Sequence, residues 1–534
     1  MSKIKNILFI MADQLRWDYL SCYGHPHLKT PNIDRLAERG LRFDRAYVQS
    51  PVCGPSRASF YTGRTVFSHG ATWNLVPLPI GELTLGDYLR PNGVTTAVVG
   101  KTHMVPDREG MARLGLNETT DIGCLISQPG FDPYERDDGL HPDKLLKHKG
   151  GKLKYNDWLR SQGYEGDNPW NDFANAGEGP DGEILSGWYL KNSNLPARIR
   201  EDHSETAYMT MRAKEFISRM GDAPWLCHLS FIKPHWPYIA PAPYHDMYGP
   251  ESFSPVHRSA DEKTDPNPVF SAFMDTQVSR TFSEEGVRET VLPAYMGLIR
   301  QIDDHLGRLF DWLEETGKSR DTMIVFTSDH GDYLGDHWMG EKELFHEQSV
   351  RVPLIIHDPR AEADATRGTV SDAFVEAIDL VPSFIEATGA PPASHRLEGR
   401  SLMPLLRGER PADWRTSVLS EIDYAFYAVR ETLELGPADA RGYMIRTENW
   451  KYVYFKGFPP QLFNLVDDPD EFTDLGRRPE HRPKCQEMHN LLLDRLLDRK
   501  NRTTMTDEEV LGVRDKEDER GIIIGKWAEV EAGT

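Results

Sequence analysis

Pairs of adjacent polar residues are the first side chains in this sequence that could do hydrolytic chemistry. Asp13-Gln14 follows the apolar run 7–12, and Asp329-His330 follows the apolar run 322–327. Carboxylate, amide and imidazole groups together suit Ca²⁺, Mn²⁺ or Mg²⁺ better than Zn²⁺. Such a cation beside an anionic ester acts as an electrophile. An Asp-Gln pair alone is more typical of a turn or helix cap, but the second pair favours a metal site.

Cys53 is the candidate nucleophile, and it opens the segment Cys53-Gly-Pro-Ser-Arg57. If a helix begins at Cys53, Arg57 lies on the same helix face, because residues four apart are neighbours on a helix. Alternatively, Cys53 is a small buried hydrophobic residue with an idle thiol. If other polar residues that could do chemistry lie near Cys53 in the fold, the nucleophile interpretation is favoured over the idle thiol.

Cationic residues also follow predicted strands. Lys101 and His103 come after one strand, His235 after another, and Lys342 lies twelve residues beyond His330. A single Lys or His at a strand end is usually solvated or already paired. Several of them at the edge where a parallel sheet delivers its active-site groups instead predict a cradle for an anion.

The composition limits the classes of partner. The 534 residues suggest two or more lobes. Lys and Arg total 62 against 83 for Asp and Glu, a net charge of −21, which argues against nucleic acid or an anionic membrane as partner. A small anionic substrate remains compatible, because salt screens distant charges over about 10 Å.

The cysteines and the N-terminal run indicate the compartment. The 5 cysteines are scattered and do not form a disulfide framework, which fits a reducing environment. The apolar run 7–12 is too short for a signal peptide or a membrane span. We therefore expect a cytoplasmic protein.

Strand and helix patterns alternate over most of residues 1–400. The predicted strands are 5–11, 95–99, 225–231, 322–327 and 352–357, and the predicted helices are 31–40, 83–89, 204–219, 291–316 and 375–388. This alternation predicts an α/β fold with a mainly parallel sheet sandwiched by helices. Residues 105–200 and 245–285 are predicted to be loop-rich walls of a substrate pocket.

The pattern of predicted strands and helices changes near residue 411. Strands at 443–446 and 450–455 and a helix at 483–498 predict a smaller α+β lobe. The predicted division is a catalytic domain at 1–410, the small lobe at 411–500 and a C-terminal arm at 501–534. The arm, with its apolar insert Gly521–Gly525, is expected either to lie on a neighbouring subunit or to be a frayed tail.

From about residue 4 to about residue 500 the chain resembles the sulfatase branch of the alkaline phosphatase superfamily. The matching pieces are Asp13-Gln14, Cys53-Gly-Pro-Ser-Arg57, Gly100-Lys-Thr-His103, Pro234-His235, Ser328-Asp-His-Gly331 and Lys342. Trp73-Asn74-Leu-Val-Pro77 and Val105-Pro-Asp107 resemble the bacterial phosphonate monoester hydrolases and the cytosolic arylsulfatases near them. The resemblance implies an alkaline phosphatase-like sheet with the smaller C-terminal lobe.

The resemblance also implies a role for each residue. Cys53 would be converted by a formylglycine-generating enzyme, a transient partner, to formylglycine (3-oxoalanine), stabilised by Arg57. One divalent ion, Ca²⁺ or Mn²⁺, would bind Asp13, Gln14, Asp329, His330 and the modified residue 53. Lys101, His235 and Lys342 would hold the transferring group with Asn74 as a further substrate contact, and His103 would lie beside the second hydroxyl of the nucleophile.

The implied activity is hydrolysis of sulfate monoesters, aryl sulfates among them, with cross-reactivity. The alternative is a phosphonate monoester hydrolase or phosphodiesterase, and a non-catalytic binding module is a third interpretation. Phosphonate hydrolases carry Tyr and Thr where this chain has Lys101 and His103, and this difference favours a sulfatase. The resemblance further implies a homo-oligomer, a dimer or tetramer.

Overall fold

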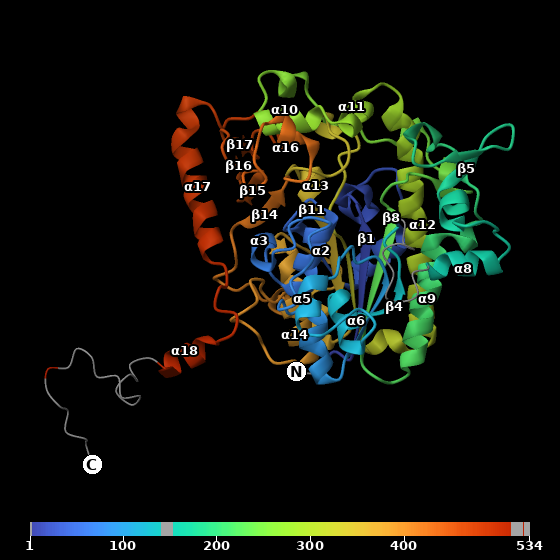
Figure 1. Ribbon diagram of the computed structural model, residues 1–534, viewed down its shortest axis with the longest axis horizontal. Helices are drawn as coiled ribbons and strands as arrows, with labels where there is room; N and C mark the ends of the chain where they lie inside the picture. The colour runs from blue at the N-terminus through green and yellow to red at the C-terminus, as the bar shows by residue number, and fades with distance from the viewer. Residues whose placement is uncertain (1–2, 140–152, 514–526, 528–534) are drawn as a thin grey trace, which may run out of the picture.

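A computed structural model describes residues 3–139, 153–513 and 527 of the chain (Figure 1). The apolar insert 521–525 of the expected arm lies outside these residues.

A 9-stranded sheet forms the centre of the molecule, in the order β12-β2-β11-β10-β1-β8-β3-β4 with β13 beside β2. Its strands are β1 Asn6–Asp13, β2 Leu41–Tyr47, β3 Thr95–Gly100, β4 Asp132–Arg136, β8 Trp225–Pro234, β10 Thr322–Ser328, β11 Arg351–His357, β12 Thr369–Ser371 and β13 Val375–Glu376. Within this sheet only β11 runs antiparallel to its neighbours β10 and β2. The predicted mainly parallel sheet is therefore confirmed.

Helices cover both faces of this sheet (Figure 1). Side chains of β1 alternate between the faces, so Phe9 packs in one hydrophobic cluster and Ile10 in the other. The Phe9 cluster includes residues of α2, α4 and α14, and the Ile10 cluster includes residues of α1, α9 and α12. Both faces of β1 are fully buried, which is why its sequence is a continuous apolar run rather than an alternating one.

The helices of the described residues are α1 Pro31–Arg39, α2 Cys53–Thr62, α3 Val66–His69, α4 Leu85–Leu89, α5 Arg108–Arg113, α6 Asp121–Ser127, α8 Lys154–Ser161, α9 Glu205–Met220, α10 Pro268–Met274, α11 Gln277–Ser283, α12 Val287–Glu315, α13 Glu347–Val350, α14 Leu380–Thr388, α15 Met403–Leu406, α16 Ala428–Thr432, α17 Arg482–Leu497 and α18 Asp507–Val513. Short strand pairs lie outside the central sheet: β5 Ala176–Glu178 with β6 Ile184–Ser186, and β7 Pro196–Ala197 with β9 Ala240–Pro241.

The helix predicted at 375–388 is shorter than expected. Residues Val375–Glu376 form β13, and α14 begins only at Leu380. The backbone N–H of Glu376 donates to Asp379 Oδ2 at 2.7 Å, which ends the strand in a tight turn. A helix starting at residue 375 would also place Pro382 in its interior, whereas α14 places it in the first turn, where proline is tolerated.

The region 245–285 is also more regular than predicted, because it contains α10 and α11. Asn267 and Thr276 cap these helices through their side-chain oxygens, which accept from the backbone N–H groups of Val269 and Ser279. Asn267-Pro268 is a helix-start signal, but each helix has only 7 residues, too few for a clear apolar period.

The C-terminal region contains a separate 4-stranded antiparallel sheet, in the order β14-β15-β16-β17. Its strands are β14 Val418–Asp423, β15 Arg441–Arg446, β16 Trp450–Phe455 and β17 Gln461–Asn464. Helix α17 packs on this sheet through Met488 and Leu492. The predicted α+β character is confirmed, while the exact domain boundaries stay a prediction.

Beyond α17, the short helix α18 stands away from the body (Figure 1). None of the described helices combines the length and the apolar character needed to cross a lipid bilayer.

Candidate active site

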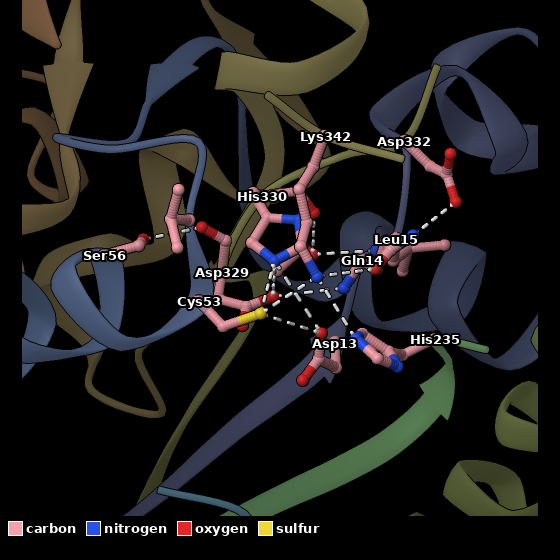
Figure 2. Close-up of polar contacts among 12 residues, drawn as sticks. Asp13, Gln14, Leu15, Cys53, Ser56, His235, Asp329, His330, Asp332 and Lys342 are labelled. Atoms are coloured by element: carbon pink, nitrogen blue, oxygen red, sulfur yellow. Dashed lines mark hydrogen bonds and ion pairs between the residues drawn. The ribbon is translucent and has the colours of Figure 1, made fainter. Parts of the chain in front are cut away.

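The carboxyl ends of four neighbouring strands meet at one edge of the sheet. Ala12 on β1 is level with Ser328 on β10, Asp13 is level with Pro234 on β8, and Gly100 on β3 is level with Ser230 on β8. The residues that follow these positions therefore emerge side by side, as Figure 2 shows for Asp13, His235 and Asp329. The sheet register itself gathers residues that are hundreds of positions apart.

Helix α2 brings Cys53 to the same place. The hydroxyl of Ser56, one turn into α2, donates to the backbone carbonyl of Asp329 at 2.6 Å. Cys53 is fully buried, and its Sγ lies 3.0 Å from His330 Nε2 and 3.2 Å from Lys342 Nζ (Figure 2). The helix predicted to open at Cys53 is thus confirmed, and the thiol lies among the candidate ligands.

The charges around Cys53 favour its ionised form. Burial raises the pKa of the thiol, but Lys342, Lys101 and His330 outweigh burial and hold the pKa well below its usual range. A thiol kept as an idle hydrophobic residue would have no such surroundings; that of Cys227, in the sheet interior, has its pKa raised by burial alone.

The predicted metal ligands converge. Ligand atoms of Asp13, Cys53, Asp329 and His330 all lie within 4.8 Å of one another, and all four residues are buried. Burial alone would lower the pKa of His330, yet Asp329 and Cys53 raise it to about 9. This part of the site therefore carries negative charge that a divalent cation would balance.

Gln14 is oriented toward this cluster. Its Nε2 donates to Asp332 Oδ2 at 2.6 Å and to the Tyr238 hydroxyl at 3.2 Å, so that Oε1 is left to accept from Lys342 Nζ at 3.1 Å. Gln14 has a left-handed backbone with φ 62°, a strained conformation that surrounding contacts must hold. Carboxylate and amide oxygens with one imidazole fit a hard divalent cation.

Arg57 joins the carboxylate ligands. Its Nε donates to Asp329 Oδ2 at 2.7 Å, its Nη2 to Asp13 Oδ2 at 3.2 Å, and its Nη1 to the Ser230 hydroxyl at 2.8 Å. These groups are completely buried. Arg57 therefore fixes the directions in which both carboxylates point.

The predicted cations reach the same centre. Lys101 Nζ lies 2.5 Å from Asp13 Oδ2, and Lys342 Nζ lies 3.2 Å from His235 Nε2. Burial, reinforced by Lys342, lowers the pKa of His235 to about 3, so this imidazole is neutral at neutral pH. Its Nδ1–H donates to the Trp236 carbonyl at 2.7 Å, which leaves Nε2 facing the Lys342 ammonium.

His103 and Asn74 also lie close to the nucleophile segment. His103 interacts with Cys53, and burial together with Lys101 lowers its pKa; its backbone N–H donates to Asp138 Oδ1 at 3.0 Å. Asn74 Oδ1 accepts from the backbone N–H of Gly54 at 2.7 Å. Asn74 thus supports the first turn of α2, and its contact with substrate stays a prediction.

Several supporting residues were missed from the sequence. Asp332 and Tyr238 orient Gln14, Asp138 holds the backbone at His103, and Ser230 contacts Arg57. Asp332 could have been found, because it lies two residues beyond His330 at the same strand end. The other three carry no motif of their own. Lys233, which precedes the Pro234-His235 pair, points elsewhere and donates to Asn175 Oδ1 at 3.0 Å.

Comparison with known proteins fits this geometry. The family model described as Sulfatase matches residues 5–390, more than half of the chain, and a model described as N-sulphoglucosamine sulphohydrolase, C-terminal, matches residues 335–498. The chain belongs to the sulfatase family. The expected family membership and the expectation of an enzyme are both confirmed.

Proteins similar to this chain are named for more than one activity. The multifunctional alkaline phosphatase superfamily protein PehA of Trinickia caryophylli is 33% identical over 89% of this chain and 92% of its own length. The arylsulfatase of Clostridium perfringens is 28% identical over 92% of this chain and 94% of its own length.

A solved structure confirms the fold class for this sulfatase family member. The phosphonate monoester hydrolase of Agrobacterium radiobacter has a TM-score of 0.80 and 27% identity, covering 95% of this chain and 99% of that one. The predicted alkaline phosphatase-like sheet with a smaller C-terminal region is therefore confirmed.

Proposed function

We propose that this protein hydrolyses sulfate monoesters, aryl sulfates among them, with residue 53 as a formylglycine nucleophile. The observation that carries the proposal is the buried Cys53 thiol, which lies within 4.8 Å of a carboxylate and imidazole cluster and 3.2 Å from the Lys342 ammonium. An anionic ester at this point meets a nucleophile, a cation site and fixed positive charges together.

Conversion of Cys53 replaces its CH₂–SH group by an aldehyde, CHO. This two-electron oxidation releases the sulfur as hydrogen sulfide and needs an external oxidant such as dioxygen, which a formylglycine-generating enzyme would use as a transient partner. Water then adds to the aldehyde and gives a geminal diol with two hydroxyl groups on one carbon. A divalent ion on Asp13, Gln14, Asp329, His330 and the modified residue 53 would supply charge neutralisation and a lowered hydroxyl pKa.

The remaining groups bind the ester and move protons. Lys101 and Lys342 hold the sulfate oxygens, beside the neutral His235. One diol oxygen attacks sulfur in line, the S–O bond to the alcohol breaks, and the alcohol leaves with the proton that the attacking hydroxyl gives up. His103 then takes the proton of the second hydroxyl, the carbonyl re-forms, and the C–O bond to the sulfate breaks. Serine could not take this last step, because its carbon carries no second hydroxyl.

The second candidate is a phosphonate monoester hydrolase or phosphodiesterase. The structural neighbour of that name, with its TM-score of 0.80, favours it. Lys101 and His103 favour the sulfatase, because phosphonate monoester hydrolases carry Tyr and Thr at these positions. The positive charge of Lys101, 2.5 Å from Asp13, could itself serve either ester. The choice between Ca²⁺ and Mn²⁺ and the assembly as a homo-oligomer stay predictions.

The nucleophile is tested by mass spectrometry of the peptide that contains residue 53. Protein from the native host is expected to show an aldehyde form with a mass about 18 Da below that of the thiol form, or a hydrated form of nearly the same mass as the thiol, differences set by the residue chemistry. Cys53→Ala is expected to keep the fold, judged by circular dichroism, and to lose nearly all turnover. An unmodified thiol in active protein, or a retained rate in Cys53→Ala, would contradict the mechanism.

The substrate is tested by comparing kcat/KM for an aryl sulfate, a phenylphosphonate monoester and a phosphate diester. All are tetrahedral monoanions of similar size, so activity toward each is expected, with the sulfate highest. If the sulfate is the poorest by orders of magnitude, the protein is a phosphonate hydrolase or phosphodiesterase instead.

A further inference from the structure

An aromatic wall made by Trp73, Phe426 and Tyr427 stands next to the candidate active site. The rings of Trp73 and Phe426 are stacked at 5.5 Å between centroids and are 6° from parallel. The ring of Tyr427 meets Trp73 edge-on at 4.4 Å. Trp73 belongs to the segment before the central sheet's β3, whereas Phe426 and Tyr427 precede α16 in the C-terminal region.

The aromatic wall is tied to the nucleophile on one side. Trp73 directly precedes Asn74, whose Oδ1 accepts from the backbone N–H of Gly54, the residue after Cys53. A Cβ atom on Gly54 would lie 3.0 Å from the Asn74 Cα, so the segment that carries Trp73 is in close contact with the first turn of α2.

On its other side the aromatic wall is tied to the cationic loop. The Tyr427 hydroxyl donates to Glu343 Oε1 at 2.8 Å, and Glu343 Oε2 accepts from the backbone N–H of Lys342 at 3.2 Å. Phe273 of α10 packs against Tyr427 at 5.4 Å. The wall is therefore held in a fixed position relative to both Cys53 and Lys342.

The wall presents apolar surface that the fold does not use. Phe426 remains 52% exposed although its ring is stacked. A single exposed apolar residue is ordinary. An immobilised ring pair beside a polar catalytic centre is different, because a ligand pocket combines apolar faces with a few convergent polar groups.

We propose that the aromatic wall is the subsite for the alcohol part of the ester, and that it selects a flat aromatic alcohol. This inference rests on the proposed ester hydrolysis at residue 53. While the cationic groups hold the anion, a ring on the alcohol would stack on the exposed face of Phe426 that Trp73 does not cover. Offset aromatic pairs add roughly 3- to 10-fold in affinity beyond the effect of buried area.

The wall also assigns a function to the C-terminal region. The metal-type cluster (Asp13, Cys53, Asp329 and His330) and the predicted cationic side chains all lie before residue 343. Phe426 and Tyr427, by contrast, follow the last strand of the central sheet. Members of one family that share the catalytic centre would then differ in substrate through this segment.

The test measures binding apart from turnover. In a Cys53→Ala background, which cannot complete the reaction, calorimetry gives the Kd of 2-naphthyl sulfate and of inorganic sulfate. Phe426→Ala is expected to weaken 2-naphthyl sulfate by about 3- to 10-fold and to leave inorganic sulfate unchanged. Phe426→Trp should restore tight binding, because it supplies a larger flat face, whereas Phe426→Leu should not.

Matched controls separate the alternatives. Leu497→Ala, at a 70% exposed position on α17, should leave both Kd values unchanged. Equal weakening of 2-naphthyl and inorganic sulfate by Phe426→Ala, or no weakening, would overturn the proposal. So would a larger loss for choline sulfate than for 2-naphthyl sulfate, because the wall would then be a site for a cationic alcohol.

The same series separates this inference from the proposed function. With residue 53 intact, kcat/KM for 2-naphthyl sulfate should fall in Phe426→Ala mainly through a higher KM, because stacking is present before and during the reaction. If the intact protein cleaves phosphonate esters and not sulfates, the proposed function fails, while the Phe426-dependent Kd decides the role of the wall on its own.

Discussion

At the scale of single residues, Arg57 connects the nucleophile helix to both carboxylates of the metal-type cluster. One guanidinium contacts Asp329, Asp13 and Ser230 through three different nitrogens. Burial lowers the pKa of Arg57, but Asp329 and Asp13 outweigh burial and raise it. A planar fork is needed for this geometry, and lysine offers only a compact point charge.

Replacing Arg57 by lysine is therefore expected to be costly. At least one buried carboxylate would lose its contact with residue 57, which costs about 3–5 kcal/mol of the free energy of unfolding at Asp329 and less at Asp13, which keeps its contact with Lys101. Urea unfolding followed by circular dichroism measures this loss. Arg35→Lys is the matched control, since Arg35 pairs with the exposed Asp311 and should cost under about 1 kcal/mol. Equal losses in the two variants would contradict the assigned role of Arg57.

The site residues could be predicted because each follows a recognisable strand or opens a helix. Asp13, His235 and Asp329 come after buried apolar runs. The register of the parallel strands then brings these residues together at one edge of the sheet. Tyr238 and Ser230 could not be predicted, because only the packed structure places them beside Gln14 and Arg57.

At the scale of elements, the loop between β10 and α13 positions Lys342. It is held by a 2.6 Å ion pair between Arg16 and Asp336 and by a 2.7 Å contact between His337 and Glu262. The loop also contains residues with a left-handed backbone, such as Glu341 with φ 60°. Such backbone strain of about 1–3 kcal/mol per residue persists only where surrounding contacts fix it.

Asp336→Ala is expected to loosen this loop. Arg16 would keep the partly exposed Asp18 as its remaining carboxylate partner, beside its contacts with the Asp332 and Tyr333 carbonyls. We expect a stability loss of about 3 kcal/mol and a lower kcat/KM, because Lys342 becomes less well placed. Calorimetry and steady-state kinetics measure the two effects. Asp372→Ala removes an exposed partner of Arg410 and should change neither quantity. An unchanged kcat/KM in Asp336→Ala would show that the loop holds Lys342 without this pair.

The elements themselves were predicted where apolar runs were long. The predicted 291–316 helix is found as α12 and the 322–327 strand as β10. Strand β2, Leu41–Tyr47, was missed because the charged residues Arg42, Asp44 and Arg45 interrupt its apolar pattern. The antiparallel direction of β11 follows from long-range pairing, which local sequence patterns do not determine.

At the scale of the whole molecule, buried neutral histidines set a pH limit on stability. Burial lowers the pKa of His69 and of His228 to about 3. The His228 ring donates from Nδ1 to the Phe9 carbonyl and accepts at Nε2 from the Tyr61 hydroxyl. The neutral form is therefore fully satisfied in the folded state, whereas the unfolded state takes up a proton below about pH 6.5.

The free energy of unfolding is accordingly expected to fall as the pH drops below about 6.5. Because the folded pKa is depressed, each such histidine contributes about 1.4 kcal/mol per pH unit to this fall. His228→Gln should reduce the slope of the free energy of unfolding against pH, between about pH 6.5 and 5, by the contribution of one proton. Urea unfolding at several pH values measures this slope. His27→Gln, at an exposed position, should leave the slope unchanged; an equal slope in His228→Gln would contradict the assignment.

The two sheets are joined by charges as well as by packing. Lys451 of β16 lies 2.9 Å from Glu347 of α13 and 2.7 Å from Glu471, and it donates to the Phe345 carbonyl at 3.0 Å. The strands on both sides of this junction were predicted from the sequence. The contact between them could not be predicted, because in the sequence Lys451 is an ordinary polar residue within a strand pattern.

The complete burial of Cys53 also bears on the order of modification and folding. Residues 53–57 lie buried in α2 once the chain has folded, so a modifying enzyme could not reach the Cys53 side chain there. Under the proposed mechanism, formylglycine would therefore be installed on the nascent or unfolded chain, before the sheet closes over it. By the same mechanism, competence for catalysis would be decided during biosynthesis, and protein that folded without the modification would stay inactive.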